Sequence, residues 1–206
     1  MENKEFIKKY KNFKIETKHL ILRPLKLSDA NDIYQAMQDK VYSKYIWVIP
    51  WPYKMRDTTK FIKDARKNLK KSTPTLIFGL WHKKDKKIIG VESLNNIQFR
   101  NKNCESGSWL ARKYWGSGLM TEARLEIFKL AFKNLKLHKI ISMVIVENKR
   151  SQKHIEKFGF KRQGYFRDEV IICGKFRNAY YYELLNKEFN YNKLKKKLLK
   201  KNENHA

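Results

Sequence analysis

The order of hydrophobic and polar positions divides the chain into predicted strands and helices. Apolar residues come close to alternation in residues 15–25, as in a half-buried strand. Pro24 interrupts this run, and Ser28 is then a candidate N-cap for a helix whose first turn is acidic. Residues 58–71 have the pattern of a second, basic helix. The chain is therefore predicted to begin with a strand and two helices.

The middle of the chain is predicted to form a sheet. Residues 75–82 and 87–94 are apolar runs joined by a polar turn at residues 83–86, which is the pattern of a β-hairpin. Residues 105–110 add a third extended run. These segments predict three strands of one sheet.

The second half alternates helices with strands. Residues 116–135 repeat apolar side chains at a spacing of four, which predicts an amphipathic helix packed on a sheet. Residues 139–146 are nearly all apolar, as in a buried central strand. A short helix over residues 150–158, ended by Gly159, precedes two extended runs within residues 165–185. This order predicts an α/β domain on a mixed sheet.

The chain is expected to hold one domain, since no repeat or Gly-, Ser- or Pro-rich linker divides it. We assign residues 1–14 to a charged leader, 15–186 to the domain and 187–206 to a lysine-rich tail. Six lysines lie within residues 193–201, and like charges so close together destabilise an isolated helix, so a frayed end is expected. The alternatives are a docked amphipathic helix and an arm for ribosomal RNA. Three leucines supply the apolar side of such a helix: Leu194, Leu198 and Leu199.

Composition narrows the classes of protein that fit. The 206 residues carry 47 Lys plus Arg against 20 Asp plus Glu, a formal net charge of +27. The 14% aromatic content excludes a wholly disordered chain. The lysines are spread from end to end, so a solvated surface accounts for most of them, and weak nonspecific contact with RNA or ribosomes is the functional alternative.

Cysteine, histidine and hydropathy patterns exclude further classes. Cys104 and Cys173 are far apart with no CxxC motif, which argues against a disulfide scaffold and a cysteine-based zinc site. The histidines lack HExxH spacing, so we expect no metal. No stretch approaches the roughly 18 to 20 apolar residues of a membrane span, so a cytoplasmic protein without membrane contact is expected.

A glycine-containing turn precedes the long helix. Gly116 and Gly118 let the backbone bend sharply and expose N–H groups at the positive end of the helix dipole, where a phosphate can bind. The segment matches neither a P-loop nor a complete dinucleotide-binding fingerprint. An ordinary strand-to-helix turn is the alternative to a site for another phosphate-bearing ligand.

Four blocks together resemble one known family. They are IETKHLILRPLKLSDANDIY, KKIIGVESL, ESGSWLARKYWGSGLMTEA and VIVENKRSQKHIEKFGFKRQGYFRD. In order and spacing they are similar to the GNAT superfamily, and specifically to its RimJ/RimL-type N-acetyltransferases. The resemblance implies a single mixed, mostly antiparallel sheet flanked by helices, with two central parallel strands that splay. It also implies transfer of the acetyl group of acetyl-CoA to an amine, with the pantetheine arm between those strands.

The resemblance also implies a set of cofactor contacts. The loop would hold the pyrophosphate of CoA through the backbone of seven residues: Lys113, Tyr114, Trp115, Gly116, Ser117, Gly118 and Leu119. Amides around Trp109 and Leu110 would polarise the thioester carbonyl. Asn148 would bond the pantetheine arm, and Ser151 would cap the next helix while facing the sulfur. Simple N-capping is the alternative for both Asn148 and Ser151.

The acceptor amine needs a base, because a free amine is largely protonated at pH 7. Glu105 matches the family's glutamate on the strand before the loop, and alternation places Gly107 and Trp109 on its face. Glu92 is the reserve base. Many relatives carry a tyrosine that acts as the general acid where this chain has Ile155. Ser151 or water is therefore expected to protonate the thiolate.

The acceptor itself is suggested by the resemblance only. Substrate contacts would come from Trp51, Tyr53, Glu92 and Arg167, although core packing or a dimer contact explains the aromatic residues equally well. A protein N-terminal α-amine, as in a ribosomal protein, is the expected acceptor. A small amine and a noncatalytic RNA- or ribosome-binding module are the alternatives, and a homodimer is common in the family.

Overall fold

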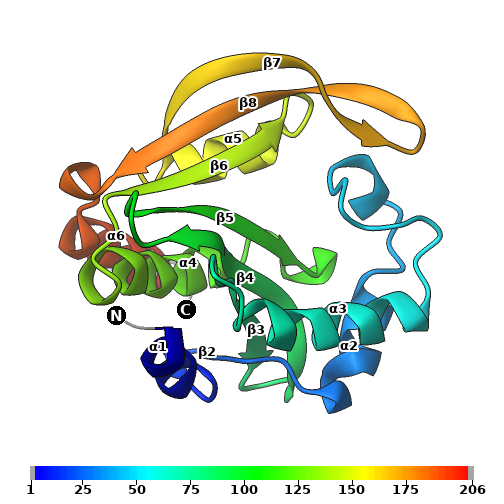
Figure 1. Ribbon diagram of the computed structural model, residues 1–206, viewed down its shortest axis with the longest axis horizontal. Coiled ribbons are helices and arrows are strands. Elements are labelled where there is room, and N and C mark those ends of the chain that lie inside the picture. The colour runs from blue at the N-terminus through cyan, green and yellow to red at the C-terminus, as the bar shows by residue number, and fades with distance from the viewer. Residues whose placement is uncertain (1–2, 204–206) are drawn as a thin grey trace.

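One eight-stranded sheet forms the centre of the molecule. The computed structural model describes the backbone of residues 3–203 and the side chains of residues 4–197. The strands are β1 (Ile15–Glu16), β2 (Leu20–Arg23), β3 (Leu76–His82), β4 (Lys87–Gln98), β5 (Asn103–Leu110), β6 (Lys139–Ile145), β7 (Lys161–Ile172) and β8 (Lys175–Leu185). Their order is β1-β2-β3-β4-β5-β6-β8-β7, and only the β5–β6 pair is parallel among the described strands. The predicted mixed, mostly antiparallel sheet is confirmed (Figure 1).

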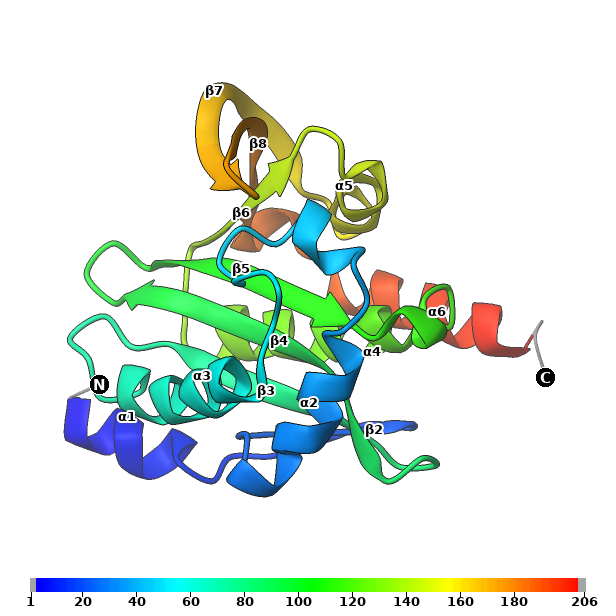
Figure 2. The ribbon, with the colours of Figure 1, turned by 90° about the vertical axis from the view of Figure 1, so that its right-hand side faces the viewer.

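Helices cover both faces of this sheet. They are α1 (Asn3–Tyr10), α2 (Ala30–Ala36), α3 (Met55–Asn68), α4 (Leu119–Lys129), α5 (Lys149–Glu156) and α6 (Tyr191–Glu203). In Figure 2, α2 and α3 lie in front of the sheet and α4 lies behind it. The strands and helices predicted from periodicity are therefore present, with boundaries shifted by a few residues.

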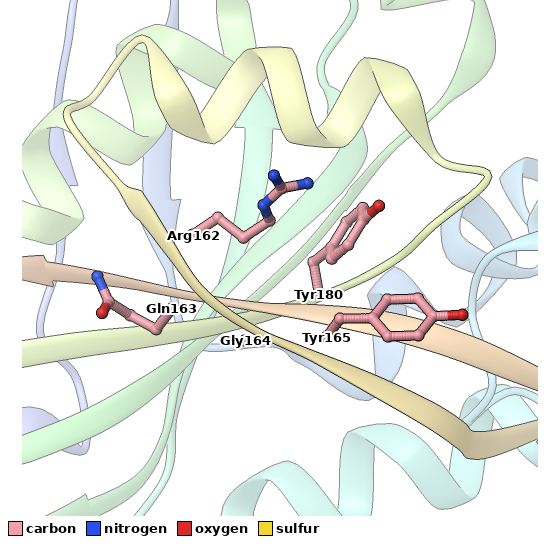
Figure 3. A pocket seen from close by; sticks show the side chains of 5 residues that line it. All are labelled: Arg162, Gln163, Gly164, Tyr165 and Tyr180. Carbon is pink, nitrogen blue, oxygen red and sulfur yellow. The ribbon is translucent and has the colours of Figure 1, made fainter.

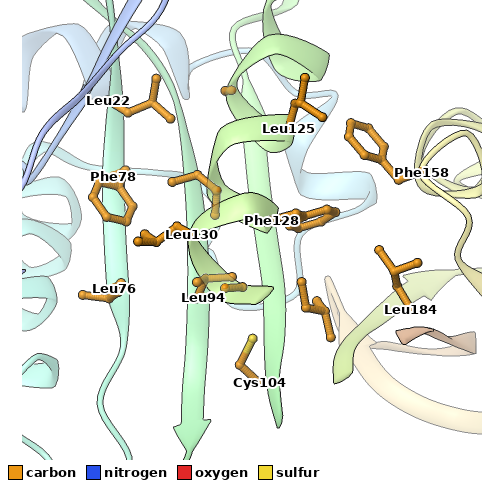
Figure 4. Packing of buried hydrophobic residues seen from close by; sticks show 14 of the residues in the cluster. Leu22, Leu76, Phe78, Leu94, Cys104, Leu125, Phe128, Leu130, Phe158 and Leu184 are labelled. Atoms are coloured by element: carbon orange, nitrogen blue, oxygen red, sulfur yellow. The ribbon is translucent and has the colours of Figure 1, made fainter. Parts of the chain in front are cut away.

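The larger hydrophobic core lies between α4 and the sheet. Phe128 and Leu125 of α4 pack across Phe78, Leu94 and Cys104 of the strands (Figure 4). A second core on the opposite face joins α2 and α3 to β4, through Ile33, Ile62 and Val91. Burial on both faces fixes which side chains of each strand can reach solvent.

The start of α2 differs from the expectation. Ser28 is exposed and lies within a 3₁₀ turn (Leu27–Asp29), and it does not cap the helix. Asp29 instead accepts a hydrogen bond from the backbone N–H of Lys26 at 2.7 Å, and its carboxylate pairs with Arg23 at 2.8 Å. A carboxylate is a stronger acceptor than a hydroxyl and makes charge-assisted bonds, so Asp29 organises this turn.

The first and last helices of the described part of the chain are both packed against the core. Within the charged leader, Phe6 and Tyr10 of α1 are 0% and 1% exposed and belong to the larger core. The expectation of a frayed tail is wrong for the described residues, because the Tyr191 hydroxyl donates to Glu126 of α4 at 2.6 Å and Leu194 packs on the larger core. The side chains of Leu198 and Leu199 lie outside the described residues. The domain boundaries themselves stay a prediction.

Candidate active site

The two parallel strands separate after three paired residues. β5 and β6 pair at Asn103–Lys139, Cys104–Ile140 and Glu105–Ile141, and beyond this point β5 continues to Leu110 and β6 to Ile145. Figure 1 shows the two strands diverging. The splay implied by the family resemblance is therefore present in the sheet.

Backbone groups of β5 face this splay. The N–H of Ala111 donates to Ile89 of β4 at 2.7 Å, and backbone groups alternate along an antiparallel strand, so those of Leu110 and Ser108 point away from β4. The carbonyl of Leu110 indeed accepts from the hydroxyl of Tyr42 at 2.9 Å instead of from β4. The amides of Ser108 and Leu110 are thus directed to the splay, whereas that of Trp109 faces β4.

The predicted cofactor loop has the backbone of an anion site. Gly116 and Gly118 have φ of +83° and +84°, the left-handed region that favours glycine. The hydroxyl of Ser117 donates to the Tyr114 carbonyl at 2.6 Å and closes the turn. Leu119 begins α4 directly after this turn.

Unpaired donors gather at the same place. In this turn and the first turn of α4, the N–H groups of Gly116, Gly118, Met120 and Thr121 have no hydrogen-bond partner among the described residues. They lie at the positive end of the α4 dipole, where an anion is stabilised. A pyrophosphate fits this donor set better than a neutral group does.

Large side chains fix the loop to the body of the protein. The Tyr114 hydroxyl contacts the Asp85 carboxylate, and the indole Nε1 of Trp115 donates to the Leu110 carbonyl at 2.7 Å. The guanidinium of Arg150 lies over the Trp115 ring. Lys113 is exposed, with its ammonium 3.9 Å from Asp85. The loop is therefore held in place by its side chains, which leaves its backbone free for a ligand.

Asn148 and Ser151 lie where β6 passes into α5. The side-chain oxygen of Asn148 accepts from the backbone N–H of Ser151 at 3.1 Å, so Asn148 is the N-cap. Ser151 lies in the first turn of the helix and does not cap it, contrary to the expectation. Its half-buried hydroxyl is thus not used for capping. Ile155, one turn later, is 1% exposed in the larger core.

Glu105 lies at the mouth of the splay. Its side chain is exposed, and Asn96 donates to its carboxylate at 3.5 Å. Trp109 on the same face packs against the second core, whereas Cys104 is 1% exposed in the larger core on the opposite face. Burial raises the pKa of the Cys104 thiol, which disfavours the nucleophilic thiolate. The predicted alternation of β5 is confirmed.

Glu92 does not join Glu105. It is 0% exposed on the α4 face of β4, and its two carboxylate oxygens each accept from Arg124 of α4 at 3.2 Å. This position is at odds with a reserve base or a substrate contact. Sequence reasoning did not identify Arg124, although an arginine between Ala123 and Leu125 on an apolar helix face was the available signal.

The expected acceptor residues are spread over three places. Trp51 borders a recess of about 150 Å³ between residues 43–51 and the tip of the β7–β8 hairpin. Tyr53 is 7% exposed and packs in the second core, where burial raises its pKa. Arg167 is exposed on β7. Only Trp51 of these three lines a recess found in the described part of the molecule.

A wider hollow of about 370 Å³ lies on the outer strands. It is lined by Arg162, Gln163, Gly164, Tyr165 and Tyr180 (Figure 3). None of these residues was predicted for the site, and all belong to β7 and β8. The start of α5 lies beside this hollow, because the ammonium of Lys149 is 5.9 Å from the ring centroid of Tyr180.

Metal-binding clusters and membrane-spanning helices are both absent from the described part of the chain. Among the described residues, no group of three or more His, Cys, Asp or Glu side chains is arranged to hold a metal ion. Nor does any helix in this part of the chain have the length and apolar character needed to cross a membrane.

A splayed parallel pair beside an anion-binding loop defines an acyltransferase that takes a coenzyme A thioester. Residues 19–161 match the family model described as the Acetyltransferase (GNAT) domain. The chain therefore belongs to this family. It is an acetyl-CoA-dependent N-acetyltransferase with acetyl-CoA as the donor.

Similar proteins agree with this family. The uncharacterized N-acetyltransferase p20 of Bacillus licheniformis is 29% identical over 175 residues, covering 84% of this chain and 96% of the relative. The ribosomal protein uS5-alanine N-acetyltransferase of Escherichia coli is 31% identical over 102 residues, or 49% of this chain and 53% of that enzyme. The chain thus aligns with only about half of the latter.

A solved structure adds a likeness in fold. The Microcin C7 self immunity acetyltransferase MccE, in complex with acetyl-CoA and AMP, superposes with a TM-score of 0.72 at 23% identity. The match covers 82% of this chain and 93% of that chain.

Proposed function

We propose that this N-acetyltransferase, of the RimJ/RimL type, acetylates the N-terminal α-amine of a protein, as in a ribosomal protein, by direct attack in a ternary complex. The observation that carries the proposal is the arrangement of β5, which holds one exposed carboxylate, Glu105, at the mouth of the splay and directs the amides of Ser108 and Leu110 to the splay. A base and oxyanion donors on one strand suit attack of an amine on a thioester.

The residues divide the reaction among them. The loop from Lys113 to Leu119 holds the pyrophosphate, and Asn148 and Ser151 lie along the pantetheine arm. The amine gives a proton to Glu105, directly or through water, and its nitrogen forms the new bond to the acetyl carbon. The amides of β5 bind the oxygen of the tetrahedral intermediate. The carbon–sulfur bond then breaks, its electron pair stays on sulfur, and the thiolate takes a proton from solvent.

The recess beside Trp51 favours a polypeptide end as the acceptor. Its volume of about 150 Å³ has room for a small side chain, and the flanking Val48 and Ile171 are 74% and 56% exposed. An open apolar border of this kind can continue along a peptide, whereas a small free amine needs enclosure. The net charge of +27 also repels polycationic amines at long range.

The relative that acetylates ribosomal protein uS5 supports the same acceptor class. An acceptor of this class would place the enzyme in the cytoplasm. The Trp51 border and Arg167 are the proposed peptide contacts.

A panel of amines tests the acceptor. The protein is incubated with labelled acetyl-CoA and matched peptides whose N-terminus is free or blocked, each containing one internal lysine, and with spermidine and an aminoglycoside. We expect label on free N-termini, with peptides blocked at the N-terminus unlabelled. Label on spermidine or the aminoglycoside at a higher kcat/KM than on any peptide would contradict the proposed acceptor.

A further inference from the structure

A buried polar network runs from β4 through α4 to the splayed part of β5. Arg124 of α4 is 4% exposed and donates to both oxygens of Glu92. The same guanidinium donates to the hydroxyl oxygen of Ser108 at 2.5 Å. Ser108 lies beyond the last β5–β6 pair and is exposed, so it is the end of the network that opens to the splay.

The donor and acceptor properties of the network determine what Ser108 can do. A guanidinium has no acceptor, so the Ser108 oxygen must accept and its own hydrogen must point elsewhere. Among the described residues this hydrogen has one acceptor, the Glu92 carboxylate, whose pKa burial raises and the hydrogen bond from Ser108 lowers, and which also accepts two bonds from Arg124. Rotation of the hydroxyl about its C–O bond can turn this hydrogen away from Glu92 and toward a ligand in the splay.

The charge of Arg124 makes this hydroxyl a stronger donor. Accepting a charge-assisted bond polarises an O–H group, and neighbouring hydrogen bonds strengthen one another. The guanidinium is held rigidly, because it also lies over the rings of Phe128 and Phe158 at 5.7 and 6.0 Å. A buried ion pair seldom adds stability compared with an apolar pair of similar size. The effect of Arg124 on its neighbour Ser108 therefore accounts for its role better than stability does.

The other titratable group close to Arg124 is neutral. His154 of α5 has a buried ring nitrogen, Nε2, without a partner among the described residues. Desolvation, assisted by the charge of Arg124, lowers the pKa of His154 to about 3. Arg124 of α4 is thus the cationic group that acts on Ser108, beside the Glu92 carboxyl group of β4, whose pKa burial raises.

Two hydroxyls can serve the leaving sulfur, that of Ser151 on α5 and that of Ser108 on β5. The amides of Ser108 and Leu110 are assigned to the carbonyl oxygen, and α5 carries the apolar Ile155 where many relatives have an acidic tyrosine. We propose that Ser108 is a catalytic residue whose hydroxyl donates a hydrogen bond to the departing thiolate of CoA, and that Arg124 is a positioning residue that orients and polarises this hydroxyl. The serine keeps its proton, and the thiolate is neutralised by solvent after the carbon–sulfur bond breaks. The inference rests on acetyl-CoA as donor and not on the identity of the acceptor.

The thiol of bound CoA reports on this hydrogen bond directly. CoA is titrated with base in the presence of saturating protein, and the thiolate is followed by ultraviolet absorbance in difference spectra against the protein alone. Wild-type protein should lower the thiol pKa relative to free CoA. Ser108→Ala should reduce the thiolate-to-thiol ratio of bound CoA about tenfold at a given pH, as expected for loss of one charge-assisted bond.

Matched variants separate this role from packing. Ser106→Ala removes a hydroxyl from the same face of the same strand and should leave the thiol pKa unchanged, and Ser108→Thr should retain most of the wild-type shift. In turnover, Ser108→Ala should lower kcat about tenfold with the KM for acetyl-CoA unchanged. If Arg124 acts through Ser108, Arg124→Met should change the thiol pKa less in the Ser108→Ala background than in wild type.

The outcomes are distinguishable. An unchanged thiol pKa in Ser108→Ala overturns the inference, as does an equal change in Ser106→Ala. Should Arg124→Met fail to fold by circular dichroism, the Ser108 and Ser106 pair still decides the question. Failure of the wild-type protein to bind CoA would overturn the cofactor assignment and this inference with it, whereas CoA binding without peptide acetylation would affect the proposed acceptor alone.

Discussion

Adding a single methyl group to Gly116 tests whether the loop binds the cofactor phosphates. Gly116 has φ of +83°, and a Cβ built on it meets no protein atom within 4 Å. Gly174, at the turn between β7 and β8, has φ of +74° and equally open surroundings. Gly116→Ala and Gly174→Ala therefore impose a similar backbone strain at two places, of which only the first belongs to the proposed pyrophosphate site.

The two variants are expected to lose similar stability and to differ in their affinity for acetyl-CoA. Holding an L-residue in the left-handed region costs about 1–2 kcal/mol. In a domain of this size about 1 kcal/mol lowers the Tm by roughly 2–4 °C, so both variants should melt about 2–8 °C below wild type. Binding should separate them, because each backbone hydrogen bond to a charged phosphate contributes about 1.5–3 kcal/mol. Loss of one such bond in Gly116→Ala weakens the affinity for acetyl-CoA by roughly ten- to a hundredfold.

Calorimetric titration with acetyl-CoA, together with thermal unfolding, checks both numbers. Gly174→Ala should lose stability and keep wild-type affinity. Equal acetyl-CoA affinity in the two variants and wild type would show that the loop backbone does not contact the phosphates, and the reasoning from its unpaired N–H groups would then be refuted.

Four further predictions concern the base, the helix cap, acid stability and the tail. Glu105→Gln should lower turnover strongly at neutral pH with near wild-type acetyl-CoA affinity and partial recovery at high pH, and an unaltered pH–rate profile would exclude Glu105 as the base. Asn148→Ala should lower the free energy of unfolding by about 1 kcal/mol through loss of the cap, whereas Ser151→Ala should leave it nearly unchanged in urea unfolding, so that any loss of turnover is chemical. Because the pKa of His154 is lowered to about 3, the free energy of unfolding should fall as the pH drops from about 6.5 toward 3, by up to about 1.4 kcal/mol per pH unit. In His154→Gln the free energy of unfolding, measured in urea, should depend less on pH over that range. Deleting residues 195–206, which spares the docked start of α6, should leave peptide acetylation unchanged and weaken salt-sensitive binding to RNA, and equal binding of labelled RNA at low salt by truncated and full-length proteins would count against a role of the tail.

Local periodicity was enough to predict most of the elements. The helix that includes Phe128 and the strand at residues 139–146 each carry their burial pattern within the segment, because one face packs on a single neighbouring layer. The tail could not be predicted in this way. Its helix is docked by Tyr191 and Leu194 against α4 and the larger core, which lie far away in the chain, and like-charge repulsion within the segment suggested the opposite.

The faces on which Glu92 and Glu105 lie could not be predicted from the sequence. Near the β4–β5 turn, Gln98 faces Asn103, and continuing that register along the strands would place Glu92 opposite Trp109, on the face of Glu105. The pairing shifts by one residue between Asn95 and Gln98, so Glu92 lies opposite Ser108 instead.

A shift of one residue moves a strand's side chains to the other face. Asn96 lies at this bulge with φ of +50°. An asparagine at this position is the one sign of the bulge in the local sequence. The bulge therefore brings Glu92 to Arg124 and leaves Glu105 alone at the mouth of the splay. The one-residue bulge thus places two carboxylates on opposite faces of the sheet: Glu105, which is available to an amine, and Glu92, which holds Arg124 beneath Ser108.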